Sequence, residues 1–495
     1  MGSIPKTPYS PTSHHLSMLQ QIFHENNATN FLIHSNKRSF NGFVAMLTNQ
    51  QKDKISQMEE SDVIVGVLDT GVWPKSDSFK DEGFRPIPKN WKGACVGGNN
   101  FTCNNKIIGA RYYIEDSARD ADGHGSHTTS TVAGNYVHKA RCDSSASLSA
   151  FDDAIANGVS IISISLGLYS QLNFEEDPIA IGSFHAMAGG ILTVNSVGNG
   201  GPLPTSISSV SMWMLSVVAN SSVVDRKIVL CDGISYVDYD GGHPIGSIIR
   251  DSNEAEILKS KTIKDLNAPM VADFSTRGPN TIVPEIMKPG ISASGVDILA
   301  SFSQVVSPSN NECDKRSLKY NIISGTSISC PHVVGIAAYM KTFHLGWSPS
   351  AIKSAIMTSA KPMKVSNDEV GEYAYGSGHV NHVHVVHPGL IYDISLDDYI
   401  QMLCNLGYDN KKIKLISGKN NSSSNATDRS LVRDLNYPAF AIDVKSRIPF
   451  TIKFERTVTN VGQPKSNYKA SILPNPKIKI TVVSETLAFE SLYEK

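Results

Sequence analysis

The sequence predicts an α/β protein with a parallel sheet flanked by helices. Residues 61–72 form a continuous apolar run, rich in β-branched side chains, that ends in an acid and a turn. Such a run is typical of a strand buried on both faces of a parallel sheet. A helix-like segment, 148–156, then gives way to a strand-like segment, 159–166. The helix opened by Asp177-Pro178 gives way in turn to a strand over 191–197, which repeats the pattern.

Length and charge limit the classes of partner. The chain has 495 residues, a formal net charge of −1 and 18% charged residues. This composition favours neither a nucleic acid nor an anionic membrane as a partner, and no apolar run is long enough to cross a bilayer. A chain of this length can bury a large core, in about three domains of ordinary size.

The segment 321–339 places a serine at the start of a helix. The small residues 324–327 predict a tight turn, and Pro331 is expected in the first turn of the apolar helix that follows. At such a place, free backbone N–H groups and the helix dipole favour the oxyanion that forms when Ser327 attacks a carbonyl. A serine there is also typical of a plain helix cap, so this segment alone leaves both interpretations open.

Two motifs earlier in the chain supply the partners that a nucleophilic serine needs. Asp69 ends the first strand, at the edge where α/β sheets place their sites. His124 opens a helix within the stretch of small residues 122–134. An acid, a histidine and a serine can act as orienting carboxylate, general base and nucleophile. Their presence together favours the catalytic interpretation of Ser327.

With these motifs the chain resembles the subtilisin-like serine proteases, and in particular the plant subtilases of the cucumisin-like group. The match rests on three blocks in chain order: Val67-Leu-Asp-Thr-Gly71, Asp122-Gly-His-Gly-Ser-His127 and Ser324-Gly-Thr-Ser-Ile-Ser-Cys-Pro-His332. The resemblance implies a serine endopeptidase in which Ser327 is the nucleophile, His124 the general base and Asp69 the orienting acid. It implies no cofactor.

The resemblance also implies an oxyanion donor and a substrate-binding edge. Asn199 follows the strand 191–197 in a glycine turn and matches the oxyanion asparagine of the family. Ser165, Leu166 and Gly167 match the strand edge on which the family binds an extended polypeptide substrate by β-augmentation.

Four histidines, His379, His382, His384 and His387, raise the alternative of a metal site. Their valine-rich, glycine-bounded stretch offers neither one helix face nor two defined turns, which zinc ligands require. The sequence therefore predicts no metal.

The family pattern divides the chain into three domains. It implies an α+β inhibitor-type propeptide over 1–60, truncated at its N-terminus, which acts as an intramolecular inhibitor. The peptidase domain follows over 61–417, with a remnant of a protease-associated insert near 226–262. An all-β, fibronectin III-like domain over 431–495 is expected to be incomplete.

Secondary structure within the two outer domains is predicted from local patterns. The expected elements are a helix over 16–20 and strands over 31–34, 42–47, 450–458, 468–473 and 478–483, with a turn at 459–462.

Two departures from the family pattern suggest missing segments. Residues 136–143 bridge a gap in which the family carries an additional strand, and residues 58–62 lack a processing linker. The absence of a core strand would leave neighbouring strands with unpaired backbone groups. The alternative to an active enzyme is therefore an impaired relative that binds extended peptides or retains its propeptide.

The cysteines and the glycan acceptors favour an oxidising compartment. Cys95 and Cys103 flank a Gly/Asn loop and predict a short local disulfide, whereas Cys330 is expected to pack as a small hydrophobe. Asn-x-Ser/Thr acceptors begin at Asn27, Asn100, Asn220, Asn420, Asn421 and Asn425. With the resemblance they indicate a secreted glycoprotein of the apoplast or cell wall, although this chain shows no signal peptide.

Overall fold

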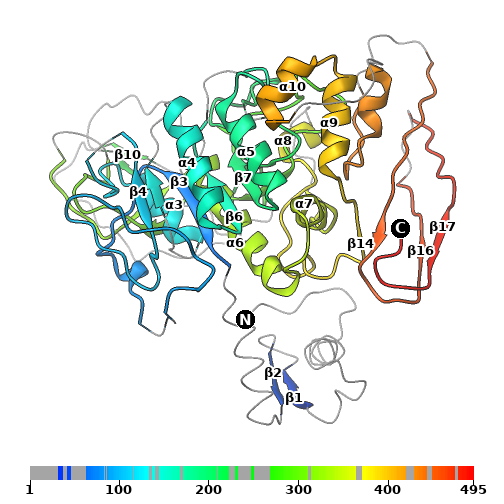
Figure 1. Ribbon diagram of the computed structural model, residues 1–495. Coiled ribbons are helices and arrows are strands. Elements are labelled where there is room, and N and C mark those ends of the chain that lie inside the picture. The colour runs from blue at the N-terminus through cyan, green and yellow to red at the C-terminus, as the bar shows by residue number, and fades with distance from the viewer. Residues whose placement is uncertain are drawn as a thin grey trace. The chain divides into compact units, whose positions relative to one another are not determined.

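The structure is a computed structural model of the chain (Figure 1). It describes the strands 32–36, 42–45, 137–139, 229–231 and 247–249 and residues 63–82, 84, 86–114, 116–132, 144–167, 171–208, 210–221, 268–309, 314–363, 371–419, 428–442, 449–473 and 478–495. The chain forms two compact units, Met1–Val63 with Thr342–Leu345, and Ile64–Lys341 with Gly346–Lys495. Each unit is considered by itself.

The first unit contains an antiparallel pair of strands, β1 (Leu32–Asn36) and β2 (Gly42–Ala45). They confirm the two strands expected in the propeptide region, although β1 ends later and β2 ends earlier than predicted. The helix expected over 16–20 lies outside the described residues.

A seven-stranded parallel sheet forms the centre of the second unit and confirms the predicted α/β class. Its strands follow the order β11-β8-β7-β6-β3-β5-β4, and each neighbouring pair is parallel. Their bounds are β3 (Val65–Asp69), β4 (Ala110–Tyr112), β5 (Val137–Lys139), β6 (Ile161–Ile164), β7 (Leu192–Ser196), β8 (Leu215–Asn220) and β11 (Ile291–Ser294). Every residue of β3, β6, β7 and β8 is buried, as the continuous apolar runs predicted.

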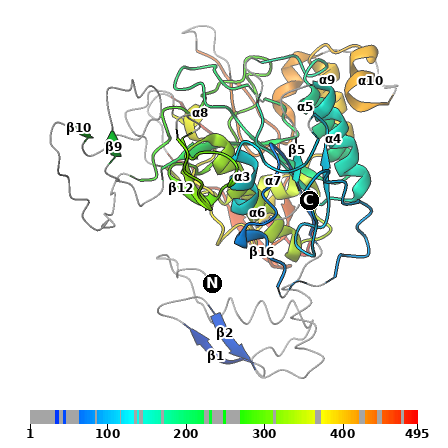
Figure 2. The same cartoon turned by 90° about the vertical axis from the view of Figure 1, so that its left-hand side faces the viewer.

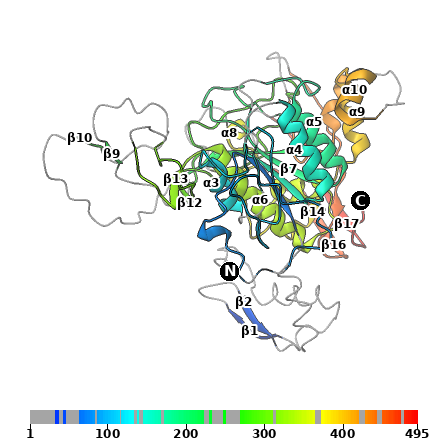
Figure 3. The same cartoon turned by 60° about the vertical axis from the view of Figure 1, so that its left-hand side comes forward.

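Helices flank this sheet, and local sequence signals set several of their ends. These helices are α3 (His124–Val132), α4 (Ser144–Asn157), α5 (Pro178–Ala188), α6 (Thr326–Phe343) and α7 (Pro349–Thr358). Asp177 caps α5 by accepting from the Ile179 N–H, and α4 stops before Gly158, whose φ is +83°. α4 and α5 pack side by side, as Figures 2 and 3 show.

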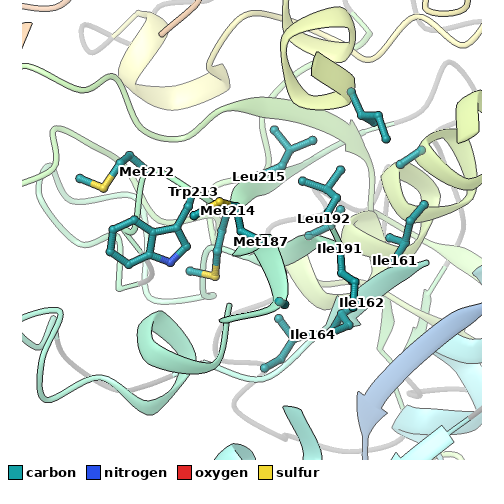
Figure 4. Close-up of a cluster of buried hydrophobic side chains, with 14 of the residues drawn as sticks. Ile161, Ile162, Ile164, Met187, Ile191, Leu192, Met212, Trp213, Met214 and Leu215 are labelled. Carbon is teal, nitrogen blue, oxygen red and sulfur yellow. The ribbon is translucent and has the colours of Figure 1, made fainter. Parts of the chain in front are cut away.

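The core is apolar and gathers where β6, β7 and β8 meet these helices. Figure 4 shows the isoleucines of β6 on the same side of the cluster as Leu192, and Trp213 on the other side, beside Met212 and Met214. The Trp213 ring packs against Phe174 and Phe184 in edge-to-face (T-shaped) geometry, at centroid distances of 5.3 and 5.0 Å. From the carboxyl ends of β6 and β7 the chain continues to the candidate site.

The predicted loss of a core strand is wrong. Residues 137–139, within the segment that was expected only to bridge a gap, form β5, which pairs with β3 on one side and β4 on the other. β3 is thus paired on both sides, with β5 and β6. The neighbours of β3 complete its ladder, so the strand that ends in Asp69 is an interior strand of the sheet.

Smaller elements complete the second unit. They are β9 (Val229–Cys231) paired with β10 (Ser247–Ile249) in the region of the expected insert, the hairpin β12 (Ile298–Ser301) and β13 (Tyr320–Ile323), and the helices α8 (Glu372–Tyr375), α9 (Leu396–Asn405), α10 (Asn410–Ser417) and η3 (Arg429–Asp434). Among the residues that the structure describes, no helix has the length and apolarity that a membrane span requires.

The C-terminal region departs from its predicted strands. β14 (Leu390–Ile391) pairs with β15 (Thr459–Asn460), at the place where a turn was expected, and β16 (Ser466–Lys469) pairs with β17 (Thr486–Phe489). Segments 450–458 and 478–483 form no strand, so those two predictions are wrong.

The segment 450–458 is held by side-chain hydrogen bonds instead of backbone hydrogen bonds to a neighbouring strand. Its side chains alternate between exposed and half-buried, which is the pattern that predicted a strand. The Arg456 guanidinium donates to the carbonyls of Arg433, Tyr437 and Ala439. These bonds fix an extended segment without a partner strand.

Candidate active site

Ser327 lies in the first turn of α6, as the sequence predicted. The helix begins at Thr326, directly after Gly325, and Ser327 is 8% exposed. Pro331 lies inside α6, beyond its first turn, so the expected first-turn position of this proline is wrong. Because the helix begins one residue before it, Ser327 lies at the helix N-terminus, where backbone N–H groups lack intrahelical acceptors.

Asp69 is the last residue of β3 and is fully buried. One carboxylate oxygen, Oδ1, lies 2.6 Å from His124 Nδ1 and accepts from the Thr70 N–H at 2.7 Å. The other, Oδ2, accepts from the Thr128 hydroxyl at 2.8 Å. Both oxygens are thus fixed by donors, which orients the carboxylate toward the imidazole.

His124 is the first residue of α3 and joins the other two side chains. Its Nδ1 faces Asp69, and its Nε2 lies 2.8 Å from Ser327 Oγ. The strand β3 and the helices α3 and α6 therefore bring together three residues that are 55 and 203 positions apart in the chain. An imidazole in this position can accept the serine proton on one nitrogen while the other is held by a carboxylate.

The environment of His124 raises the pKa of its imidazole to about 9. Burial acts in the opposite direction, since it disfavours the charged ring, but the charge and hydrogen bond of Asp69 outweigh it. Asp122 and Asp120 add smaller contributions in the same direction as Asp69. The site therefore stabilises an imidazolium, the form that the ring takes after it accepts a proton.

Asn199 lies beyond β7, and its amide faces the start of α6. The side-chain oxygen accepts from the backbone N–H and the hydroxyl of Thr326, both at 2.9 Å. A Cβ added at Gly325 would lie 3.6 Å from Asn199 Nδ2 and 3.1 Å from Ser327 Oγ. The amide nitrogen and the serine hydroxyl thus border one small space, which the absence of a side chain at Gly325 keeps open.

The three residues predicted to bind substrate follow β6 directly. Leu166 and Gly167 are half-buried, whereas Ser165 is 7% exposed. The Ser165 hydroxyl turns inward and donates to the carbonyl of Ser327 at 3.0 Å. The structure thus brings this edge against the Ser327 residue itself, a contact that sequence reasoning missed.

Asp120 is a site residue that sequence reasoning missed. Its buried carboxylate accepts from the Thr70 hydroxyl at 3.0 Å and from the backbone N–H groups of Asp122, Gly123 and Ser126 at 3.0, 2.8 and 2.8 Å. It thereby ties the loop after Asp69 to the first turn of α3. The only signal in the sequence is an acid shortly before a helix start, which is typical of any capped helix.

Of the four histidines considered as metal ligands, His379 is engaged by a side chain outside the Asp69, His124 and Ser327 group. His379 is hydrogen-bonded through Nδ1 to the Asn220 side chain at 2.9 Å, and burial lowers the pKa of its ring to about 4. Within the described ranges, no group of three or more His, Cys, Asp or Glu side chains is arranged to hold a metal ion. Cys330 is buried, and burial raises the pKa of its thiol to about 12, which disfavours the reactive thiolate.

Known proteins are similar to this chain along its whole length. The family model described as the subtilase family matches residues 60–378, that of the peptidase inhibitor I9 matches 2–65, and that of the fibronectin type-III domain matches 434–495. Two similar relatives are the subtilisin-like proteases SBT4.9 and SBT4.10 of Arabidopsis thaliana, 39% and 41% identical to this chain. The alignments cover 100% of this chain and 88% and 87% of the relatives. The alignment with SBT4.9 spans 634 residues, so that relative carries segments that this chain lacks.

Proposed function

Since the chain belongs to the subtilase family of serine endopeptidases, we propose that it cleaves peptide bonds with Ser327 as nucleophile, His124 as general base and Asp69 as the acid that orients the imidazole. The observation that supports these roles is the continuous pair of hydrogen bonds, 2.6 Å from Asp69 to His124 and 2.8 Å from His124 to Ser327. A capping serine would not require a buried acid behind a histidine.

In this mechanism the Ser327 hydroxyl attacks the scissile carbonyl while His124 Nε2 takes its proton. The buried charge of Asp69 stabilises the imidazolium, which then donates the proton to the leaving amine. Asn199 Nδ2 and the Ser327 N–H hold the oxyanion of the tetrahedral intermediate in the space beside Gly325. Water enters after the amine leaves, and the same steps in reverse hydrolyse the acyl-enzyme.

The partners follow from the family. A subtilase domain acts on polypeptides, and the match to peptidase inhibitor I9 supports an intramolecular inhibitor at the N-terminus. Ser165, Leu166 and Gly167 would pair with the substrate backbone beyond the end of β6. The proposed domain division is 1–60, 61–417 and 431–495.

No finding supports the alternative of an impaired relative. The main reason for that alternative was the expected absence of a core strand. The structure has a strand there, β5, which pairs with both β3 and β4. Residues 58–62, where a processing linker was expected to be missing, lie outside the described residues.

A fluorophosphonate probe tests the proposed function directly. The probe phosphonylates a serine only when a neighbouring base activates it. We expect the purified protein to be labelled at one site, mapped by peptide mass to Ser327, and Ser327→Ala to be unlabelled. Ser329→Ala, two residues further along α6, is the matched control and should label like the parent. Equal labelling of the parent and Ser327→Ala would contradict the assignment.

Asn199→Ala is expected to lower kcat on the order of a hundredfold or more, with a smaller change in KM, because the donor acts mainly on the oxyanion. Asn199→Asp should lose a similar factor, since it keeps the oxygen that accepts from Thr326 but has no N–H. Thr326→Val removes one hydrogen bond to Asn199 and leaves both proposed oxyanion donors, the Asn199 amide and the Ser327 N–H, in place. Its kcat should therefore fall by less than about tenfold. Steady-state kinetics on a fluorogenic peptide would measure these losses, and a fully active Asn199→Ala would remove the oxyanion role.

An extracellular, glycosylated form is part of the proposal. The predicted disulfide between Cys95 and Cys103 is present, which supports an oxidising compartment such as the apoplast or cell wall. Asn100, within that loop, is exposed and can accept a glycan. Asn220 is fully buried in β8, so its acceptor motif is not accessible in the folded chain.

A further inference from the structure

Pro331 removes one hydrogen bond from the first turns of α6. In a regular helix, the N–H of residue 331 would donate to the carbonyl four residues earlier, which belongs to Ser327. Proline has no N–H, so this carbonyl loses its helical partner. The affected peptide belongs to the proposed nucleophile.

The Ser165 hydroxyl supplies the missing donor. Its Oγ donates to the Ser327 carbonyl at 3.0 Å, and both residues are more than nine-tenths buried. Without this bond the carbonyl would be a buried acceptor next to a proline, with no intrahelical donor, which is unfavourable.

The donor is rigidly placed. Ser165 follows Ile164, the last residue of β6, an interior strand that pairs with both β3 and β7. The first turns of α6 also contact the sheet, because Cys330 Sγ lies 3.4 Å from the Val194 carbonyl in β7 and 3.8 Å from the Ile164 carbonyl in β6. The Ser165 bond therefore fixes the peptide of Ser327 relative to the sheet.

We propose that Ser165 is a positioning residue for the nucleophile: its side chain replaces the helical hydrogen bond that Pro331 removes and holds Ser327 in reach of His124. The inference depends on the proposed role of Ser327. It adds an inward role for the side chain to the expected pairing of residues 165–167 with substrate. Through this one residue the expected substrate edge and the nucleophile are directly hydrogen-bonded.

A double-mutant cycle tests the inference. Ser165→Ala removes the donor, and Pro331→Ala restores a backbone N–H that can donate to Ser327. We expect Ser165→Ala to lower kcat and the rate of fluorophosphonate labelling roughly tenfold each, the effect of one lost buried hydrogen bond. Pro331→Ala should stay within about threefold of the parent, and the double variant should recover most of the loss.

Ser163→Ala is the matched control. It removes a buried hydroxyl from β6 whose Oγ lies 3.9 Å from Cys330 Sγ, and it leaves the Ser327 carbonyl bond intact. We expect it to be as active as the parent. Thermal unfolding of all variants would identify any that fail to fold, and a folded Ser165→Ala with reduced labelling isolates positioning from stability.

The labelling rate separates the two roles of the edge, because the small probe does not pair along residues 165–167. A Ser165→Ala variant with a raised KM and an unchanged labelling rate would overturn the inference and leave only substrate pairing. So would equal losses in Ser165→Ala and the double variant. If Ser327→Ala itself is labelled and active, the proposed function fails instead, which is a distinct result.

Discussion

His124→Ala is expected to lower kcat by on the order of a million-fold, the size of loss known for subtilisin when its histidine is removed. The variant has no group within 2.8 Å of Ser327 Oγ to take its proton, and it leaves the charge of Asp69 without its partner. Residual turnover would come from substrate binding and the oxyanion donors. Single-turnover hydrolysis of a peptide substrate would measure the loss.

Two comparisons make this result specific. His185→Ala removes an exposed imidazole from α5 and should keep full activity. The double variant His124→Ala with Ser327→Ala should lose no more than either single variant, because base and nucleophile act as one unit. Losses that multiply in the double variant would show that the two residues act independently, which contradicts the proposed proton transfer.

The residues of the candidate site were predictable because each stands at the end of a secondary-structure element. An apolar run that stops at an acid marks the end of a strand, which located Asp69 at the end of β3. Stretches of small residues that open a helix mark a helix start, which located His124 and Ser327. Local patterns give such positions, whereas the distances between these side chains result from packing the sheet against α3 and α6.

The part played by Asp120 and the inward contact of Ser165 with Ser327 were not predictable in the same way. The donors to Asp120 include Thr70, a residue 50 positions away, and the acceptor of Ser165 lies 162 positions away. Acids before a helix and serines after a strand are common, so their residue types carry no signal of these contacts. Pro331 was placed in the first turn because a proline is most easily accommodated there. It is tolerated further along because the side chain of Ser165, the residue after β6, donates to the carbonyl that it leaves without a helical donor.

The errors in the strand prediction have a shared cause. Val137–Lys139 is too short and too polar to be read as a buried strand, and its ladder partners come from β3 and β4. Residues 450–458 show strand-like alternation, yet Arg456 holds the segment through carbonyls of the preceding loop. Strand formation depends on available partners in space, and alternation alone does not supply them.

Asp69→Asn is expected to lower kcat by on the order of ten thousand-fold, as in serine proteases whose triad acid becomes an amide. The Thr70 N–H and the Thr128 hydroxyl already donate to the two side-chain oxygens at this position. An asparagine amide has only one oxygen. Its NH₂ group would therefore face one of these two donors and could not accept a hydrogen bond from it. The His124 ring would then be held in the wrong tautomer or not at all.

The pH profile of Asp69→Asn gives the sharper test. The neutral form of His124 is the base, so kcat/KM of the parent should rise with pH until the pH passes the imidazole pKa of about 9. Asp69 is the main group that raises this pKa against the effect of burial, so its neutralisation should move the rise to lower pH while the plateau falls. Thr128→Val is the matched control: it removes one hydrogen bond and keeps the carboxylate charge, so its rise should stay close to that of the parent. A rise that remains near pH 9 in Asp69→Asn would mean that another group holds the charge of His124, and Asp69 would lose its proposed role.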